Sequence, residues 1–387
     1  MGLLLVMSCA QAVAQDTLRI ATYNLLNYPG SDAAIRNPYF RTVVHTINPD
    51  VLIVQEMLSQ TGVTGFLSNV MNAYQPGKYT SVPFDDGPDT DNSFYYNSSK
   101  VVYHGATYIG TALRRIAEYR FAPVGSVDTI RIYSLHLKAN PEDSLVRLGE
   151  ATILRDHLNS LPSGAKFIVG GDFNIYRSSE PAFLKLIGSD ANDNGRCKDP
   201  LNSVGNWNNN FSFRFIHTQS PRVRGFGGGA TGGMDDRFDM LLTSYSMDGV
   251  IHVPSYTSYG NDSNHFNDSI NRLPNSAVPD SVANALHYAA DHLPVFADFI
   301  FPQTAVIDMQ LASKWNLLSL PVVPNDARKT SLFPTAISNA FYFGQFGYTV
   351  EDTLKNGTGY WVKFDTAQTV TIAGAVLESD TISVGSG

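Results

Sequence analysis

The chain has 387 residues, a formal net charge of −8 and a pI near 5.5. Its length suffices for one large domain and a smaller one, and its 43% hydrophobic and 16% charged residues are typical of a globular protein with a substantial core. The acidic balance excludes a strong, sequence-independent electrostatic grip on nucleic acid over the whole surface, but not a nuclease whose basic groups or metal ions act locally.

Residues 1–15 resemble the end of a secretory signal peptide. The apolar run of residues 2–7 is followed by small residues at Ala12 and Ala14, which fit a cleavage site just before Gln15, although no Lys or Arg precedes the run. We therefore expect bacterial export, with the mature protein secreted, periplasmic or on the cell surface. A disordered or mis-started N-terminus is the alternative.

The two cysteines add little further constraint. Cys9 follows the apolar run as a poor lipoprotein acceptor, and the sequence does not decide whether it is lipidated. If it is removed with the leader, only Cys197 remains and no intrachain disulfide can form. No later run is long and apolar enough to span a membrane.

Apolar periodicity predicts many strands with a few helices between them. The predicted strands cover residues 18–25, 50–56, 93–96, 101–103, 129–137, 167–171 and 237–242, with a last one within 289–299. The predicted helices cover residues 37–48, 62–73 and 144–158.

The stretch Phe167–Asn174 organises this pattern. Three apolar residues and two glycines read as a buried strand that ends abruptly on Asp172 and Asn174. Residues i and i+2 of an extended chain point to the same side, so these two side chains can face one cleft. The glycines leave room for a ligand or another backbone segment. Taken alone, the stretch is equally well explained as a strand followed by an Asx-type turn.

Polar residues recur at the ends of the predicted strands. Each alone has an ordinary explanation as a turn former or cap, but ligands gather where strand ends and their loops converge. The recurring residues are Asn24, Glu56, His136, Asp172, Asn174, Asp239, Asp291 and His292.

These segments resemble the endonuclease/exonuclease/phosphatase superfamily, whose members include deoxyribonuclease I, abasic-site endonucleases and bacterial sphingomyelinases. The resemblance covers roughly residues 17–300, and the motifs occur in the family's order. It implies a four-layer α/β sandwich of two packed mixed β-sheets flanked by helices. The segments that carry it are Ala21–Asn24, Val54–Glu56, Ser134–Leu137, Gly171–Asn174, Arg237–Asp239 and Ala290–Val295.

The resemblance also implies a divalent metal ion, Mg²⁺ or alternatively Mn²⁺. Glu56 would be its first ligand, assisted by Asn24, with Asp291 as a second ligand. Mg²⁺ keeps several waters, so one or two protein acids suffice to hold it.

By the same resemblance, Asp172 would orient or deprotonate the attacking water and Asn174 would donate to a phosphate oxygen. His292 would contact the phosphate or act as acid/base, held in one tautomer by Asp239. His136 would be a candidate general acid for the leaving oxygen. Hydrolysis of a phosphodiester needs such groups because negative charge builds on the phosphoryl and leaving oxygens.

Arginines near these motifs are weaker candidates for phosphate contacts. Arg222 and Arg224 begin a glycine-rich segment, residues 222–236, that is either a mobile substrate loop or a flexible surface connection. Arg120 is a further candidate, together with Arg114 and Arg115.

After Phe301 the sequence changes character. Residues 302–387 read as a small all-β module, and we expect it to be truncated. Residues 1–15 would thus be the leader and 16–301 the catalytic domain. The module's aromatic residues are either core or, if exposed, a surface that binds a glycan or a cell surface.

The favoured function is a secreted, metal-dependent phosphodiester hydrolase, most simply a nuclease acting on DNA or RNA. The alternatives are a lipid or sugar phosphatase or sphingomyelinase-like phosphodiesterase on the same fold, and a binding protein with an inactive site. The sequence does not decide between endo- and exonuclease cleavage, or the oligomeric state.

Overall fold

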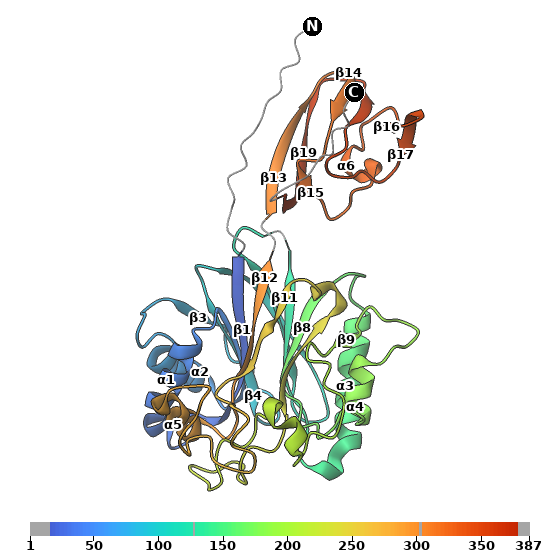
Figure 1. Cartoon of the computed structure of the whole chain (residues 1–387). Coiled ribbons are helices and arrows are strands. Elements are labelled where there is room, and N and C mark those ends of the chain that lie inside the picture. Colours follow the sequence, from blue (N-terminus) through green and yellow to red (C-terminus); the bar gives the residue numbers. More distant parts are fainter. Residues whose placement is uncertain (1–15, 127, 302–303, 378–387) are drawn as a thin grey trace. The chain divides into compact units, whose positions relative to one another are not determined.

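The computed structural model describes residues 16–126, 128–301 and 304–377, which form two compact units (Figure 1). The larger unit comprises Thr17–Val124 and Asp128–Ile300, and the smaller one includes the described residues of 301–377. The expected boundary after residue 301 stays a prediction. The expected signal peptide and Cys9 lie outside the described residues.

The larger unit contains two six-stranded mixed sheets. The first has the strand order β11-β12-β1-β2-β4-β3, with β1 and β2 parallel and β2 and β4 antiparallel. Its strands are β1 (Asp16–Tyr28), β2 (Val51–Met57), β3 (Tyr79–Ser81), β4 (Asp91–Asn97), β11 (Ile251–Ser258) and β12 (Val295–Phe301).

The second sheet has the order β5-β6-β7-β8-β10-β9, in which β7 and β8 are parallel and β8 and β10 antiparallel. Its strands are β5 (Val101–Ile109), β6 (Ile116–Pro123), β7 (Ile130–His136), β8 (Lys166–Asp172), β9 (Cys197–Lys198) and β10 (Asp239–Ser244).

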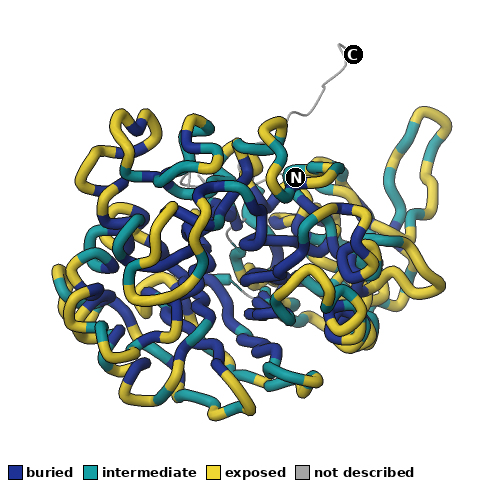
Figure 2. The backbone as a smooth tube through the Cα atoms, turned by 90° about the horizontal axis from the view of Figure 1, so that it is seen from below, coloured by how far each residue is buried: buried dark blue, intermediate teal, exposed yellow. Residues whose placement is uncertain are grey.

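The two sheets pack face to face through β2 and β4 on one side and β6, β7 and β8 on the other. Ring stacking of Phe94 on Tyr119, with centroids 4.9 Å apart, joins the sheets. A side chain at Gly170 would lie 2.9 Å from Ile53 of the opposite sheet, so this glycine permits the close approach. Figure 2 shows buried stretches of the backbone toward the middle of the view and mostly exposed stretches toward its edge.

Helices cover the outer face of each sheet (Figure 1). On the first sheet lie α1 (Ala33–Ile47), α2 (Gln60–Phe66), its π-helical continuation η1 (Leu67–Met71) and α5 (Asp280–Ala289); on the second lie α3 (Ser144–Asn159) and α4 (Pro181–Ile187). The α1 face that packs inward carries Phe40, Val43, Val44 and Ile47, at the spacing expected of an amphipathic helix. The helix ends at Asn48, whose left-handed backbone returns its N–H to the Val44 carbonyl.

The architecture confirms the predicted four-layer α/β sandwich and the C-terminal all-β module. Several elements were not predicted: β6 and β11 carry charged or polar residues that obscure alternation, and α4 and α5 are short. The single-turn 3₁₀ helices are η2 (Pro141–Asp143) and η4 (Tyr245–Met247), and η3 spans Phe211–Ile216.

The smaller unit consists of a three-stranded and a four-stranded antiparallel sheet. Tyr360, Val362 and Phe364 of one strand point into its own core, together with Leu318 and Phe333. Its elements are β13 (Thr304–Leu311), β14 (Lys314–Leu318), β15 (Val322–Val323), α6 (Lys329–Leu332), β16 (Ala340–Gly344), β17 (Gly347–Glu351), β18 (Tyr360–Phe364) and β19 (Gln368–Val376).

Candidate active site

The polar residues at the strand ends of the larger unit are linked by hydrogen bonds and short contacts. They come from both sheets: Asn24 and Glu56 from β1 and β2, and His136, Asp172 and Asp239 from β7, β8 and β10. Register explains part of this, because Asp172 pairs with His136 on one side and with Asp239 on the other. Asn24 and Glu56 reach the same place because their sheet packs face to face against this one.

Asp172 lies at the centre of this group. Its Oδ2 accepts a hydrogen bond from Asn24 Nδ2 at 3.1 Å, and its Oδ1 accepts one from the Asn174 backbone N–H at 3.0 Å. Oδ2 also lies 3.4 Å from His136 Nε2 and 3.6 Å from His292 Nε2. Burial, with smaller effects from neighbouring carboxylates, raises the pKa of Asp172 to about 7. A carboxylate with such a pKa is suited to accept a proton near neutral pH.

Gly171 explains how the Asp172 strand fits against its neighbour. Its φ of +140° is open to glycine, and a Cβ there would lie 1.9 Å from the carbonyl oxygen of Leu135. We expected these glycines to leave room for a ligand or another backbone segment, and at Gly171 the neighbour is the backbone of β7.

Asn24 connects the carboxylates of the two sheets. Its Nδ2 donates to Glu56 Oε1 at 3.0 Å as well as to Asp172, and its Oδ1 accepts the Leu26 N–H at 3.0 Å. The side-chain oxygen that would bind a metal ion is thus already engaged by the backbone. In this arrangement Asn24 positions Glu56, and because its Oδ1 keeps a second lone pair, the expected role as a metal ligand stays a prediction.

The backbone N–H of Asn174 holds this residue close to Asp172, and its side-chain amide faces the backbone of Leu137. Its Nδ2 donates to the Leu137 carbonyl at 3.1 Å. One N–H of this amide remains for a phosphate oxygen, as the sequence predicts for this residue.

His136 is buried between the two sheets. Its Nδ1 lies 3.9 Å from Glu56 Oε1 and has no hydrogen-bond partner in the described part of the chain. Burial, and then the positive charges of Arg114 and His292, lower the pKa of this ring well below its usual value. A neutral ring donates a hydrogen bond from one nitrogen, and the expected role of His136 as a general acid for the leaving oxygen stays a prediction.

His292 and Asp239 form the pair that the sequence predicts. His292 Nδ1 lies 2.7 Å from Asp239 Oδ2, although the residues are 53 positions apart. Burial alone would lower the pKa of His292, but the carboxylates of Asp239, Asp172 and Asp291 outweigh it and raise the pKa well above its usual value. Thr218 Oγ1 accepts the Asp239 backbone N–H at 3.0 Å and fixes the start of β10.

The glycine-rich segment lies against Asp291. The Ala230 N–H donates to Asp291 Oδ2 at 2.6 Å, and a Cβ on Gly229 would lie 2.6 Å from the same oxygen. Asp291 Oδ1 is buried and has no hydrogen-bond partner among the described residues. One oxygen of this carboxylate is therefore available to another group.

The residues here fit a hard divalent cation. Burial, and then the nearby negative charge of Asp291, raise the pKa of Glu56, so a cation between these carboxylates would relieve both their repulsion and the unpaired Asp291 oxygen. Two carboxylates plus waters match what Mg²⁺ requires. Across residues 16–126, 128–301 and 304–377, no preformed group of three or more His, Cys, Asp or Glu side chains could hold a metal ion.

Four non-glycine residues at these strand ends have left-handed backbones. They are Leu26 (φ 51°), Asn27 (φ 50°), Glu56 (φ 60°) and Asn174 (φ 51°). The turn at Leu26 and Asn27 lets the Asn27 N–H donate to Glu56 Oε2 at 2.9 Å. Such backbones are sparsely populated by side chains other than Asn and Asp, and they mark constrained sites.

The arginines differ in their relation to the site. Arg114 Nη1 lies 3.5 Å from the Leu137 carbonyl at the His136 end, and its Nη2 pairs with Asp89 at 2.8 Å. Arg120 pairs with Arg131 in the β6–β7 register, five residues before His136, which is roughly 16 Å along the strand. This placement does not support the expected phosphate contact of Arg120.

The two arginines of the glycine-rich segment are also separated. Arg222 is fully buried, and its Nη1 donates to the Phe226 carbonyl. Burial lowers its pKa, and Asp291 opposes that effect. Arg224 is exposed. Arg222 thus binds the backbone of the glycine-rich segment itself. Arg115 forms an ion pair with Asp85 at 2.6 Å.

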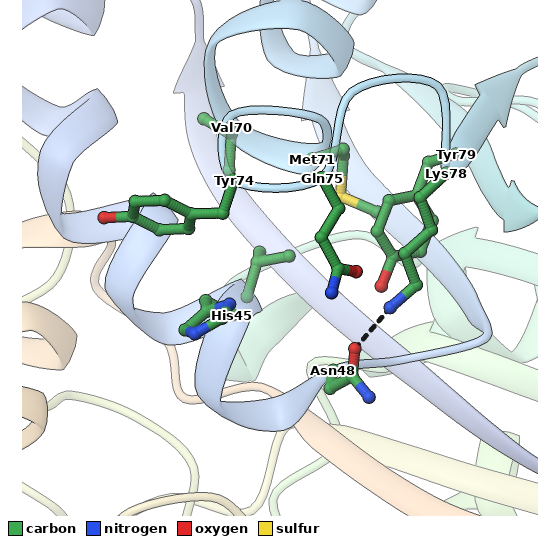
Figure 3. Close-up of a pocket in the computed structure, with 9 residues that line it drawn as sticks. His45, Asn48, Val70, Met71, Tyr74, Gln75, Lys78 and Tyr79 are labelled. Atoms are coloured by element: carbon green, nitrogen blue, oxygen red, sulfur yellow. Dashed lines mark hydrogen bonds between the residues drawn. The ribbon is translucent and has the colours of Figure 1, made fainter.

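A separate hollow between α1 and η1 does not compete with this site (Figure 3). It is lined by His45, Asn48 and Tyr74 among others, and the Lys78 ammonium group donates to the Asn48 carboxamide oxygen across it. Its volume of about 10 Å³ holds at most one water molecule. In the described residues, no helix is both long and apolar enough to cross a membrane.

Comparison with known proteins identifies the family. The sequence model of the Endonuclease/Exonuclease/phosphatase family matches residues 21–306. No curated protein shows significant sequence similarity to the chain.

Solved structures share the fold at low identity. A humanized TDP2 from D. rerio has 14% identity and a TM-score of 0.50, covering 73% of this chain and 98% of that one. A family protein from Bacteroides thetaiotaomicron has 17% identity and a TM-score of 0.49, covering 75% and 99%. The human Nocturnin catalytic domain with bound sulfate has 15% identity and a TM-score of 0.46, covering 74% and 97%.

The chain therefore belongs to the endonuclease/exonuclease/phosphatase family, and its fold is that of a phosphodiesterase- or nuclease-type hydrolase.

Proposed function

We propose that this member of the family is a divalent-metal-dependent phosphodiester hydrolase, and specifically a nuclease that is exported from the cell. The observation that carries the proposal is the meeting of His292, paired with Asp239 at 2.7 Å, with the Asp172 carboxylate at 3.6 Å. The proximity of these side chains supports the proposal, because a hydrogen-bond donor for a phosphoryl oxygen would then lie next to a base for water. An inactive binding protein has no need of such a group.

Mg²⁺ is the proposed ion, with Mn²⁺ as a substitute, and Glu56 and Asp291 would hold it. When bound, the ion supplies positive charge to the phosphoryl oxygens. Support comes from the raised pKa of Glu56, the unpaired Asp291 oxygen and the general use of divalent metals in the family.

The chain's own residues divide the remaining work. Asp172 Oδ2 would accept the proton of the attacking water, and Asn24 and the Asn174 N–H keep this carboxylate oriented. His292 would donate through Nε2 to a phosphoryl oxygen while Asp239 fixes its Nδ1. The neutral His136 would donate a hydrogen bond toward the leaving oxygen.

Nucleic acid is the proposed substrate, with a lipid or sugar phosphate as the alternative on the same fold. Purified protein should be assayed on plasmid DNA, RNA, sphingomyelin and a phosphomonoester, with and without Mg²⁺. Cleavage of DNA or RNA alone supports the nuclease assignment, and hydrolysis of only sphingomyelin or the monoester replaces it. If none of the four substrates is hydrolysed in a metal-dependent way, the protein is instead a binding protein with an inactive site.

Export is supported by the leader-like residues 1–15. When the full chain is expressed in a bacterium, the exported protein should begin at Gln15. Retention in the cytoplasm with an intact N-terminus would contradict export.

The small module has an aromatic surface that favours a second, binding function. Trp315, Phe341, Tyr348 and Trp361 line a hollow of about 450 Å³ on its four-stranded sheet. Trp315 and Tyr348 are 49% and 62% exposed, so they are not core residues. Flat aromatic rings at a surface provide stacking area together with polar tips. We propose that this surface binds a glycan, on a cell surface or free.

The glycan proposal is tested by retention of the full chain on insoluble polysaccharides. Trp361→Ala should lower retention while hydrolysis of a small soluble substrate stays unchanged. Equal retention of the variant and the wild type would contradict it.

A further inference from the structure

The reactive nitrogen of His292 has a neighbour that none of the sequence motifs includes. Gln219 Nε2 lies 2.6 Å from His292 Nε2, the ring atom that also faces Asp172. The other ring nitrogen is occupied by Asp239. The Gln219 carboxamide therefore lies beside the ring nitrogen that would contact a phosphoryl oxygen.

The backbone on either side holds Gln219 in this place. Its N–H donates to the Asp236 carbonyl at 3.1 Å, and its carbonyl accepts the Asp236 N–H at 3.0 Å. The preceding residue, Thr218, accepts the Leu293 N–H at 2.7 Å. The backbone at Gln219 is therefore held both by Asp236, which precedes β10, and by Leu293, which follows His292. This fixed backbone directs the Gln219 side chain at the site before any substrate binds.

The chemistry of a carboxamide leaves this side chain with a spare donor. An amide carries two N–H bonds and a carbonyl oxygen, and which end faces a ring nitrogen is an assignment. Whichever end faces His292, at least one N–H remains, and the described residues provide no second hydrogen bond to it. Gln219 is only partly buried, so this donor is open to a ligand.

We propose that Gln219 is a catalytic residue that donates a hydrogen bond to a non-bridging phosphoryl oxygen of the substrate, beside His292. The inference deepens the proposed function and depends on it, because the ligand it names is the phosphoryl group of that reaction. A side chain that only oriented the ring would need an oxygen that accepts a hydrogen bond from the ring N–H, and it would have no use for the spare amide N–H.

Two substitutions separate these roles. Gln219→Ala removes the donor, and kcat/KM on a small soluble phosphodiester should fall roughly 10–100-fold, as expected for a hydrogen bond to a charged group. Gln219→Glu keeps an acceptor for the ring but presents a carboxylate to the phosphoryl oxygens, and it should be worse than Gln219→Ala. The matched control is Gln75→Glu, an exposed glutamine at the hollow in Figure 3.

Binding of inorganic phosphate gives a readout that is independent of hydrolysis. Calorimetric titration in Mg²⁺ should show Gln219→Glu weakened at least roughly tenfold, with Gln75→Glu unchanged. Melting temperatures close to wild type would show that both variants are folded.

The inference is overturned if Gln219→Glu binds phosphate as tightly as wild type, or is more active than Gln219→Ala. Either result would make Gln219 a ring-positioning residue. If the wild type hydrolyses no phosphate ester, the proposed function fails, but the phosphate titration still decides whether Gln219 contacts the anion.

Discussion

The pairing of His292 with Asp239 makes a quantitative prediction. The hydrogen bond is 2.7 Å long, and the two side chains are 3% and 0% exposed, so water does not replace a lost partner easily. Removing the ring in His292→Ala should slow hydrolysis roughly 10²–10⁴-fold, the range for losing an acid/base group. This corresponds to about 3–5 kcal/mol of transition-state stabilisation.

Asp239→Ala keeps the ring but loses its acceptor. A hydrogen bond to a charged group contributes about 1.5–3 kcal/mol, so the rate should fall roughly 10–100-fold. Because Asp239 acts through His292, the double variant should be little slower than His292→Ala. If the two acted separately, the losses would multiply to roughly 10³–10⁶-fold, using the same ranges.

The assay is the initial rate on a small soluble phosphodiester at saturating Mg²⁺, with melting temperatures to confirm folding. Asp248→Ala is the matched control, because that exposed carboxylate forms a surface ion pair with Lys198 and should leave the rate unchanged. Multiplicative losses in the double variant would refute the idea of a coupled pair.

Three further predictions concern the metal and the domains. Glu56→Gln should raise the Mg²⁺ concentration needed for activity, whereas Asp172→Asn should lower the rate even at saturating metal; if both only need more metal, Asp172 is a ligand. Folding raises the pKa of Asp172 to about 7 and that of His292 well above its usual value, so the folded state holds protons that the unfolded chain releases, and metal-free stability should fall as the pH rises above about 6.5. Differential scanning fluorimetry in metal-free buffer should therefore show a melting temperature that falls as the pH is raised through this range, and an unchanged or rising melting temperature would argue against it. Residues 16–301 should fold alone and keep their activity, as circular dichroism and the same rate assay would show, and an unfolded fragment would disprove the boundary.

Much of this site could be predicted from sequence because its acids and histidines follow apolar strands. An apolar run ending in Glu56 or Asp172 fixes where a side chain lies along a strand, and the sheet then places strand ends together. The burial that lowers the pKa of His136 depends on the opposite sheet, which no local pattern reveals.

The orientation of individual side chains and the conformation of the loops could not be predicted from the sequence. Nothing in the sequence around Asn24 shows that its oxygen is taken by the Leu26 N–H. Gln219 lies in a loop without periodicity, next to an ordinary Thr and Ser, and becomes significant only when the chain near His292 packs against it. Arg120 was an attractive candidate by charge alone, and the strand register moved it away.

The left-handed backbones at Leu26, Asn27, Glu56 and Asn174 have a consequence for the protein's evolution. Each such residue with an ordinary side chain costs roughly 1–2 kcal/mol, and glycine would relieve that cost. Glycine at Glu56 would do so only by deleting a candidate metal ligand. A search for thermostable variants that ignored activity should therefore drift toward glycine at position 56, and a lineage that had lost the need for hydrolysis would be free to follow the same route.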